Sequence, residues 1–156
     1  MKIRVGFGFD VHQLVENHPF ILGGVKLEHY SGAFGHSDAD VLVHAICDAL
    51  LGAANLRDIG YHFSNTDDRW KGISSLILLK ESFELLKKEG WKVGNTDSVI
   101  ILEEPKIYKH TDLMKKNISE IIETENISIK ATTSEGIGFV GRKEGCAAYS
   151  TVLIYK

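Results

Sequence analysis

Asp10 and His12 are separated by one residue near the start of the chain, and His44 follows further along. On a β-strand, side chains two residues apart leave the same face, so Asp10 and His12 would point in one direction. One carboxylate and two imidazoles suit a zinc ion, and three protein ligands leave one coordination position open for chemistry. These residue types indicate a catalytic metal site, whereas a hydrogen-bonded pair at the end of an apolar strand is the competing interpretation.

His44 lies within a predicted helix that carries an acidic residue one turn away on each side. Asp40 precedes it by four residues and Asp48 follows it by four, and residues at this spacing are neighbours on a helix. A carboxylate often holds the non-ligating ring nitrogen of a metal-binding histidine. We therefore expect either Asp40 or Asp48 to orient the His44 ring, and the pattern leaves the choice between them open.

A second polar group follows a predicted strand near the C-terminus, where Thr132, Thr133, Ser134 and Glu135 lead into a glycine-rich stretch. Glycines allow backbone N–H groups to approach a phosphate closely, and the threonine hydroxyls could add donors. An irregular connection between strands is the alternative. The stretch lacks the glycine spacing of a dinucleotide fingerprint, and the chain has no Walker-type lysine motif.

Alternating strands and helices would have to position these residues. Apolar runs bounded by turn residues predict strands at 3–9, 20–27 with an interruption at Gly23 and Gly24, 98–103, 127–133 and 147–155. Helices are expected to begin near Ser37, Ser74 and Thr111, with the serines as N-caps. Asp38 and Asp40 would then lie in the first helical turn. The alternation predicts an α/β fold, an α+β sandwich in which helices cover one face of a mixed sheet.

The composition is that of an ordinary soluble domain. The 156 residues are 44% hydrophobic and 25% charged, which predicts a single domain over residues 1–156 with a core that needs no disulfide. A net charge of −3 gives no electrostatic reason to expect nucleic acid or an anionic membrane as partner. Cys47 and Cys146 form no CxxC pair and are expected to be reduced and buried. The absence of a targeting or membrane-spanning segment favours a cytoplasmic protein.

Short motifs follow one another in order over nearly the whole chain. The motifs are Gly8-Phe9-Asp10-Val11-His12, Gly23-Gly24-Val25, His36-Ser37-Asp38-Ala39-Asp40-Val41 with His44-Ala45, Asp48-Ala49-Leu50-Leu51-Gly52-Ala53-Ala54, Asp58-Ile59-Gly60, Pro105-Lys106, Lys130-Ala131-Thr132-Thr133, Glu135, and Gly138-Phe139 leading into Gly141-Arg142. This ordered series of motifs resembles the 2-C-methyl-D-erythritol 2,4-cyclodiphosphate synthase family. Each is weak alone, but their order is specific. One segment departs from the family: Phe63-Ser64-Asn65-Thr66-Asp67 stands where Phe-Pro-Asp-Thr-Asp is common, which puts contacts of Ser64 and Asn65 in doubt.

The resemblance implies the roles of individual residues. By it, one zinc ion per subunit is bound by Asp10, His12 and His44, while Glu135 binds a second divalent cation, Mg²⁺ or Mn²⁺, that accompanies the substrate. It also implies that His36 and Thr133 stabilise the transition state. The residues implied to contact substrate are Asp10, His12, His36, Ser37, Asp58, Ile59, Gly60, Phe63, Asp67, Pro105, Lys106, Ile107, Thr132, Thr133, Ser134, Glu135, Phe139 and Arg142.

The implied reaction belongs to the non-mevalonate route to isoprenoid precursors. Its substrate is 4-diphosphocytidyl-2-C-methyl-D-erythritol 2-phosphate, whose 2-phosphate attacks the β phosphorus, closes the 2,4-cyclodiphosphate and expels CMP. The resemblance further implies a homotrimer in which neighbouring subunits supply the metal end and the cytosine pocket around residues 102–108. Two rival functions remain: a zinc-dependent phosphohydrolase that uses the same trio, and a non-enzymatic, zinc-stabilised trimer that binds nucleotides.

Overall fold

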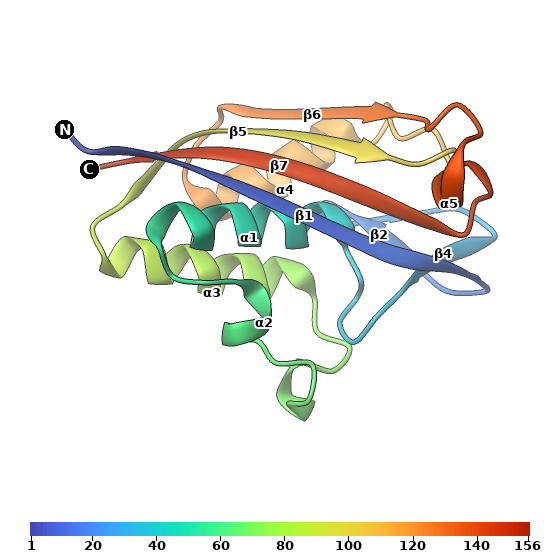
Figure 1. Ribbon diagram of the computed structural model, residues 1–156, viewed down its shortest axis with the longest axis horizontal. Coiled ribbons are helices and arrows are strands. Elements are labelled where there is room, and N and C mark those ends of the chain that lie inside the picture. Colours follow the sequence, from blue (N-terminus) through green and yellow to red (C-terminus); the bar gives the residue numbers. More distant parts are fainter.

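A five-stranded mixed sheet runs the length of the molecule and carries the main helices on one face (Figure 1). This computed structural model describes all residues, 1–156. The strands follow the order β4-β1-β7-β5-β6, in which only β5 and β6 are parallel neighbours. Their bounds are β1 Ile3–Glu16, β4 Ser31–Phe34, β5 Lys92–Ile101, β6 Ile127–Thr132 and β7 Gly145–Tyr155. A separate hairpin pairs β2 (Phe20–Leu22) with β3 (Val25–Leu27).

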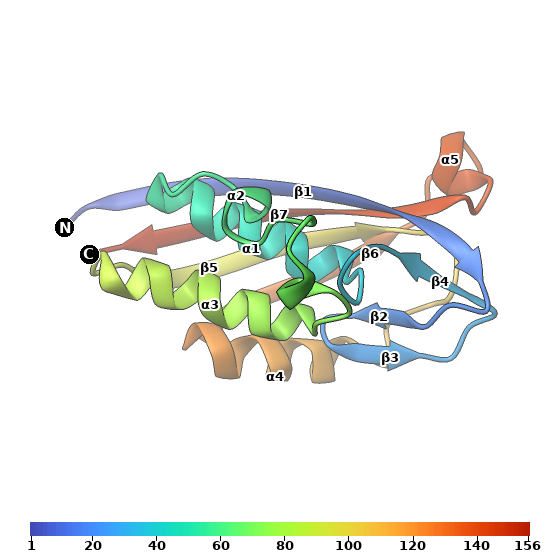
Figure 2. The same ribbon diagram turned by 90° about the horizontal axis from the view of Figure 1, so that it is seen from below.

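Three helices form the layer beneath the sheet (Figures 1 and 2). They are α1 (Val41–Ala54), α3 (Ser75–Lys88) and α4 (Thr111–Ile122). Almost every residue of α1 is buried because the helix packs on β1 and β7 on one side and on α3 on the other. Short elements connect or follow these helices: α2 (Ile59–His62), the 3₁₀ turn η1 (Asp68–Trp70) and α5 (Gly138–Gly141).

Two glycines of β1 set how closely α1 approaches the sheet. A Cβ atom at Gly6 would overlap the carbonyl oxygen of Ala49, and one at Gly8 would overlap that of Ala45. The backbone of α1 therefore lies directly against β1, which a side chain at either position would prevent. Because His44 precedes Ala45 on the helix, this close packing brings His44 next to Asp10.

The other face of the sheet carries none of the three main helices (Figure 1), and its β1 portion is apolar. The alternate residues of β1 that point to it are all exposed: Ile3, Val5, Phe7, Phe9 and Val11. Tyr149 of β7 lies across two of them, with ring centroids 5.9 Å from Phe7 and 4.8 Å from Phe9. The expected arrangement, helices on one face of a mixed sheet, is confirmed.

One predicted helix start is wrong, and a second is right in position but not in its capping contact. The first helix begins at Val41 with Asp40 as its N-cap, so Ser37 lies before the helix and Asp38 is outside its first turn. Ser74 does stand at the N-cap of α3, but its side chain makes no capping hydrogen bond. The carboxylate of Asp38 instead accepts from the backbone N–H of Ser75, 2.9 Å away. A carboxylate brought in from another loop has replaced the local hydroxyl as the cap.

The remaining elements agree with the predicted order but not with its lengths. β1 and β5 extend several residues beyond the predicted strands, and β4, α2 and α5 had no counterpart in the prediction. Both cysteines are buried and free, as expected. No helix combines the length and apolar character needed to cross a membrane.

Candidate active site and metal centre

Asp10, His12 and His44 come together at the junction of β1 and α1. One ligand atom from each residue lies within 4.8 Å of the others. The Asp10 Oδ2 atom is 2.8 Å from His12 Nδ1 and 3.1 Å from His44 Nδ1. The predicted trio is therefore one spatial cluster, and both imidazoles present the same ring nitrogen to the carboxylate.

The cluster fits a cation better than it fits a hydrogen-bonded pair. His12 Nδ1 is buried and has no hydrogen-bond partner, although it lies close to Asp10, because the approach lacks hydrogen-bond geometry. A donor atom buried without a partner is costly unless a ligand satisfies it. Burial raises the pKa of Asp10, but the adjacent imidazoles of His12 and His44 outweigh this effect and lower the pKa overall. An ionised carboxylate with two imidazoles is a donor set that zinc accepts.

The far side of the His44 ring is held by hydroxyl groups and not by a carboxylate. His44 Nε2 lies 2.8 Å from Ser75 Oγ and 3.1 Å from Ser37 Oγ. The prediction that Asp40 or Asp48 would orient this ring is wrong. Asp40 is turned toward the backbone N–H groups of the β2–β3 turn and of its own helix, and Asp48 accepts from the N–H of Ile59.

A pocket of about 450 Å³ opens over the trio. Its walls include the predicted residues His36, Ser37, Ile59, Gly60 and Phe63. The ring of His36 is fixed by a 3.2 Å hydrogen bond from Nε2 to the carbonyl of Asp67. The walls also include Asn65, whose contacts the sequence puts in doubt, and four residues that carried no prediction of a site: Phe34, Gly35, Trp70 and Leu78.

A second pocket, of about 440 Å³, contains the predicted cytosine-binding segment. Its walls combine the segment after β5 with the end of β6: Leu102, Glu103, Pro105, Lys106, Ile107, Tyr108, Thr111, Ile129, Ala131, Thr132 and Thr133. The two pockets share no residue. Because β1 and β6 are three places apart in the sheet, their backbones are separated by roughly 14 Å.

The polar loop after β6 is organised by its own side chains. Thr133 Oγ1 donates to Glu135 at 3.1 Å, and Glu103 accepts from both the N–H and the hydroxyl of Ser134 at 2.9 Å. Glu135 itself adopts a left-handed conformation with φ of 56°. The exposed carboxylate of Glu135 thus lies beside Thr133, a residue that lines the second pocket.

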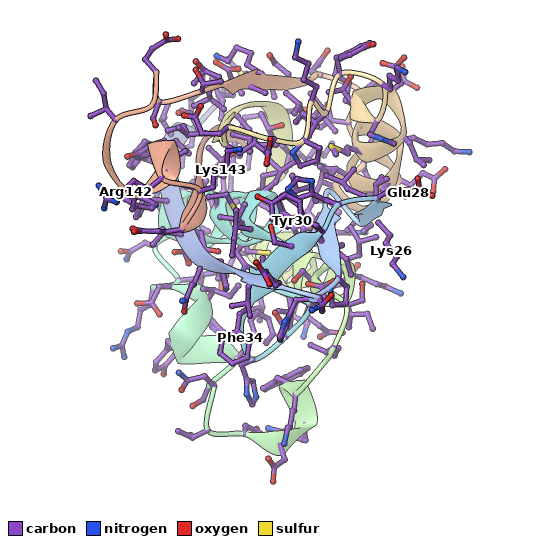
Figure 3. The ribbon with its side chains drawn as sticks, turned by 90° about the vertical axis from the view of Figure 1, so that its right-hand side faces the viewer. Lys26, Glu28, Tyr30, Phe34, Arg142 and Lys143 are labelled. Carbon is purple, nitrogen blue, oxygen red and sulfur yellow. The ribbon has the colours of Figure 1, made fainter.

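Glu104 ties this region to two other segments at the same end of the sheet. Its Oε1 atom accepts from the Tyr30 hydroxyl at 3.0 Å and pairs with the Lys143 ammonium at 3.0 Å. Figure 3 views this end of the molecule, with Tyr30 and Lys143 contributed by segments far apart in the sequence. These contacts fix the start of the predicted cytosine-binding segment.

Six predicted substrate contacts line neither pocket in the single chain: Asp58, Asp67, Ser134, Glu135, Phe139 and Arg142. Asp67 is paired with Arg69 at 2.6 Å, and Arg142 is paired with Glu144 at 3.0 Å. Asp58 caps α2 by accepting from Tyr61 N–H at 2.8 Å. Sequence reasoning missed Trp70, whose ring meets that of Phe63 at 5.2 Å; a large aromatic residue within a polar loop was the available signal.

The comparisons with known proteins cover the whole chain. Residues 3–155 match the YgbB family. The chain is 58% identical over 158 residues to 2-C-methyl-D-erythritol 2,4-cyclodiphosphate synthase of Cytophaga hutchinsonii, covering 100% of this chain and 99% of that protein. Its fold matches the bifunctional IspDF from Campylobacter jejuni with a TM-score of 0.94 and 41% identity, covering 98% of this chain and 42% of that longer chain. A 2C-methyl-D-erythritol-2,4-cyclodiphosphate synthase in a CDP-bound form matches with a TM-score of 0.89 and 34% identity, covering 97% and 100% of the two chains.

Proposed function

The chain belongs to the YgbB family, and from this premise we propose how its two pockets convert 4-diphosphocytidyl-2-C-methyl-D-erythritol 2-phosphate to 2-C-methyl-D-erythritol 2,4-cyclodiphosphate with release of CMP. This lyase reaction is a step of isoprenoid biosynthesis. The observation that carries the assignment of the site is the convergence of Asp10, His12 and His44 at the first pocket. A buried nitrogen without a partner at this point supports a bound cation.

The first pocket would hold the phosphates that react. Asp10, His12 and His44 are the ligands of a zinc ion, a choice supported by one carboxylate and two imidazole donors. When bound, this cation and a second one, Mg²⁺ or Mn²⁺ on Glu135, supply Lewis acidity that offsets the negative charge of the phosphates. His36, whose Nε2 donates to a backbone carbonyl, would stabilise the transition state through Nδ1 with the ring protonated, because only then does Nδ1 carry a proton to donate.

The second pocket would hold the cytidine. Pro105, Lys106 and Ile107 line it together with Thr132 and Thr133. The Thr133 hydroxyl donates to the Glu135 carboxylate in the single chain and would donate to the diphosphate once Glu135 binds its cation. The base would be read mainly by backbone groups of the 102–108 segment.

The chemistry requires orientation and not a protein nucleophile. An oxygen of the 2-phosphate bonds to the β phosphorus while the bond from that phosphorus to the bridging oxygen breaks, and CMP leaves with the bridging oxygen. Holding both phosphates in line can contribute roughly 7–11 kcal/mol through orientation alone. The aromatic walls formed by Phe63 and Trp70 would keep competing water away from the β phosphorus.

The choice between cyclase and phosphohydrolase is tested by isotope content. With purified protein, zinc and magnesium in ¹⁸O-labelled water, a cyclase releases CMP and a cyclic product that both lack the label. A phosphohydrolase incorporates one labelled oxygen at the phosphate it attacks. Label in the product of the main reaction would overturn the proposed function.

We also propose that each active site joins the first pocket of one subunit to the second pocket of its neighbour in a homotrimer. The separation of the two pockets in one chain and the uncovered apolar face of the sheet support this assembly. Its test is to mix two inactive variants, His12→Ala and Glu135→Gln. Random exchange of subunits should restore about one quarter of the sites, because each defect lies on a different side of the shared interface. Two variants that stay inactive after verified exchange would contradict shared sites.

A further inference from the structure

Ser75 and Asp38 form a buried chain of hydrogen bonds behind the metal-facing His44. Ser75 is the first residue of α3 and is fully buried. Its hydroxyl contacts two groups, the carboxylate Oδ1 of Asp38 and the Nε2 of His44. The other carboxylate oxygen, Asp38 Oδ2, accepts from the Ser75 backbone N–H at 2.9 Å. Both the hydroxyl and the backbone N–H of Ser75 therefore donate to Asp38.

The number of protons available fixes which group donates in each of these hydrogen bonds. An ionised carboxylate accepts hydrogen bonds and donates none, whereas a serine hydroxyl has a single proton to donate. The Ser75 proton therefore points to Asp38, and the Ser75 oxygen must accept from His44. The proton of that last hydrogen bond belongs to His44 Nε2, which leaves Nδ1 as the nitrogen free to bind a cation.

The other neighbour of Nε2 does not impose this direction. Ser37 Oγ lies at 3.1 Å from His44 Nε2 and accepts from the N–H of Ala39 at 3.3 Å, but no carboxylate fixes its proton. Ser37 is also partly exposed and lines the pocket. Ser75 is thus the contact that determines which nitrogen of His44 carries hydrogen.

We propose that Ser75, fixed by Asp38, is a positioning residue for metal binding: it holds the His44 ring in the orientation and tautomer that present Nδ1 to the zinc ion. Asp10 Oδ2 and His44 Nδ1 are already 3.1 Å apart in the cluster, so a cation replaces a proton between them without rotation of the ring. Neither Ser75 nor Asp38 contacts the cation itself. This inference rests on the proposed zinc site and adds the groups that orient one of its ligands.

The test is the zinc dissociation constant, measured by competition with a chelator, for the wild-type protein and for Ser75→Ala and Asp38→Asn. Loss of a group that orients a metal ligand typically weakens binding 10–100-fold, and we expect a loss in this range for each variant. Ser82→Ala is the matched control, because Ser82 is another fully buried serine of α3 and its hydroxyl has no hydrogen-bond partner. It should change zinc affinity by less than about twofold.

A merely structural role would not reproduce two further results. Because Ser75 and Asp38 act in series, the double variant should bind zinc no more weakly than Ser75→Ala alone, whereas independent defects would add. In the zinc-loaded wild-type protein, the His44 Nε2 proton should be visible by NMR and exchange slowly with solvent. In Ser75→Ala this proton should exchange faster or disappear from the spectrum.

The outcomes separate this inference from the site on which it rests. Wild-type protein that fails to bind zinc would overturn both. Wild-type affinity in Ser75→Ala, or an equal loss in Ser82→Ala, would overturn the positioning role alone. If Ser75→Ala does not fold, Asp38→Asn decides the question through its zinc affinity and the exchange rate of the His44 Nε2 proton.

Discussion

Gly8 of β1 lies so close to Ala45 of α1 that a Cβ atom at position 8 would overlap the Ala45 carbonyl oxygen. This contact lies two residues from Asp10 on the strand and one residue from His44 on the helix. The distance between the two elements that carry the candidate metal ligands is therefore set by the absence of a side chain at Gly8. Packing in the core and the geometry of the site are determined by the same contact.

Gly8→Ala should consequently weaken both the fold and metal binding. Forcing a methyl group into this contact should cost about 1–3 kcal/mol in the free energy of unfolding and should lower zinc affinity because α1 moves away from β1. Gly52→Ala is the control, since nothing lies within 4 Å of a Cβ atom on Gly52. That change within a helix should stabilise the protein by about 0.5–1 kcal/mol. Urea unfolding and zinc titration measure both effects; equal behaviour of the two variants would contradict the packing argument.

Asp40 should make stability depend on pH. Its burial raises the pKa from 3.8 to about 6, against backbone hydrogen bonds from Gly24, Val43 and Gly23 that lower it. Between about pH 4 and 6 the native protein keeps a proton on Asp40 that the unfolded chain has released, so the free energy of unfolding falls as pH rises through this window. The full effect is on the order of 3 kcal/mol.

The variant Asp40→Asn isolates this contribution, because an amide does not titrate. Urea unfolding near pH 4.5 and near pH 7 should show a smaller decrease in stability for the variant than for the wild-type protein. Contributions from other groups cancel in the difference between the two proteins. If the free energy of unfolding changes equally with pH in the two proteins, Asp40 titrates at its ordinary pKa in the folded state.

Glu135→Gln should separate the two proposed cations. The carboxylate is exposed and lies beside Thr133, outside the pocket that contains the trio. We therefore expect the variant to retain zinc with unchanged affinity but to lose the stimulation of CMP release by magnesium. Magnesium titrations of activity, with zinc content measured in parallel, test this expectation. A loss of zinc from the variant would argue against two separate metal sites.

The apolar face of β1 predicts the effect of a charge at Phe7. Phe7 is 64% exposed and lies among other uncovered apolar residues of the same strand, an arrangement typical of an interface. Phe7→Asp should prevent assembly of the proposed trimer while leaving the helix-side core intact. Sedimentation should then find a folded monomer without turnover, whereas a fully active monomer would contradict active sites shared between subunits.

Features that depend only on local sequence patterns were predicted correctly. The one-residue spacing of Asp10 and His12 on a strand placed both on one face, and the order of strands and helices gave the layered architecture. The partners of His44 could not be predicted in the same way. Helical spacing pointed to Asp40 and Asp48, but both carboxylates satisfy backbone N–H groups.

The group that does hold His44 comes from a different helix. Ser75 reaches the ring only because α3 packs beside α1, a tertiary relationship that local spacing does not contain. The shift of the first helix start from Ser37 to Asp40 has a similar cause, since Asp40 is drawn inward by the turn at Gly23 and Gly24. Hydrogen bonds between residues far apart in the sequence thus determine both the partner of His44 and the start of the first helix, and local spacing does not predict them.

The most direct test of the cation-dependent cyclisation uses protein stripped of all metal ions. The metal-free protein is incubated with 4-diphosphocytidyl-2-C-methyl-D-erythritol 2-phosphate and followed by phosphorus NMR, before and after zinc and magnesium are added back. We expect CMP and the cyclic diphosphate to form only after the ions are restored, and His12→Ala to remain inactive under both conditions. Formation of the ring at the normal rate by the metal-free protein would contradict the assignment of Asp10, His12 and His44 to catalysis.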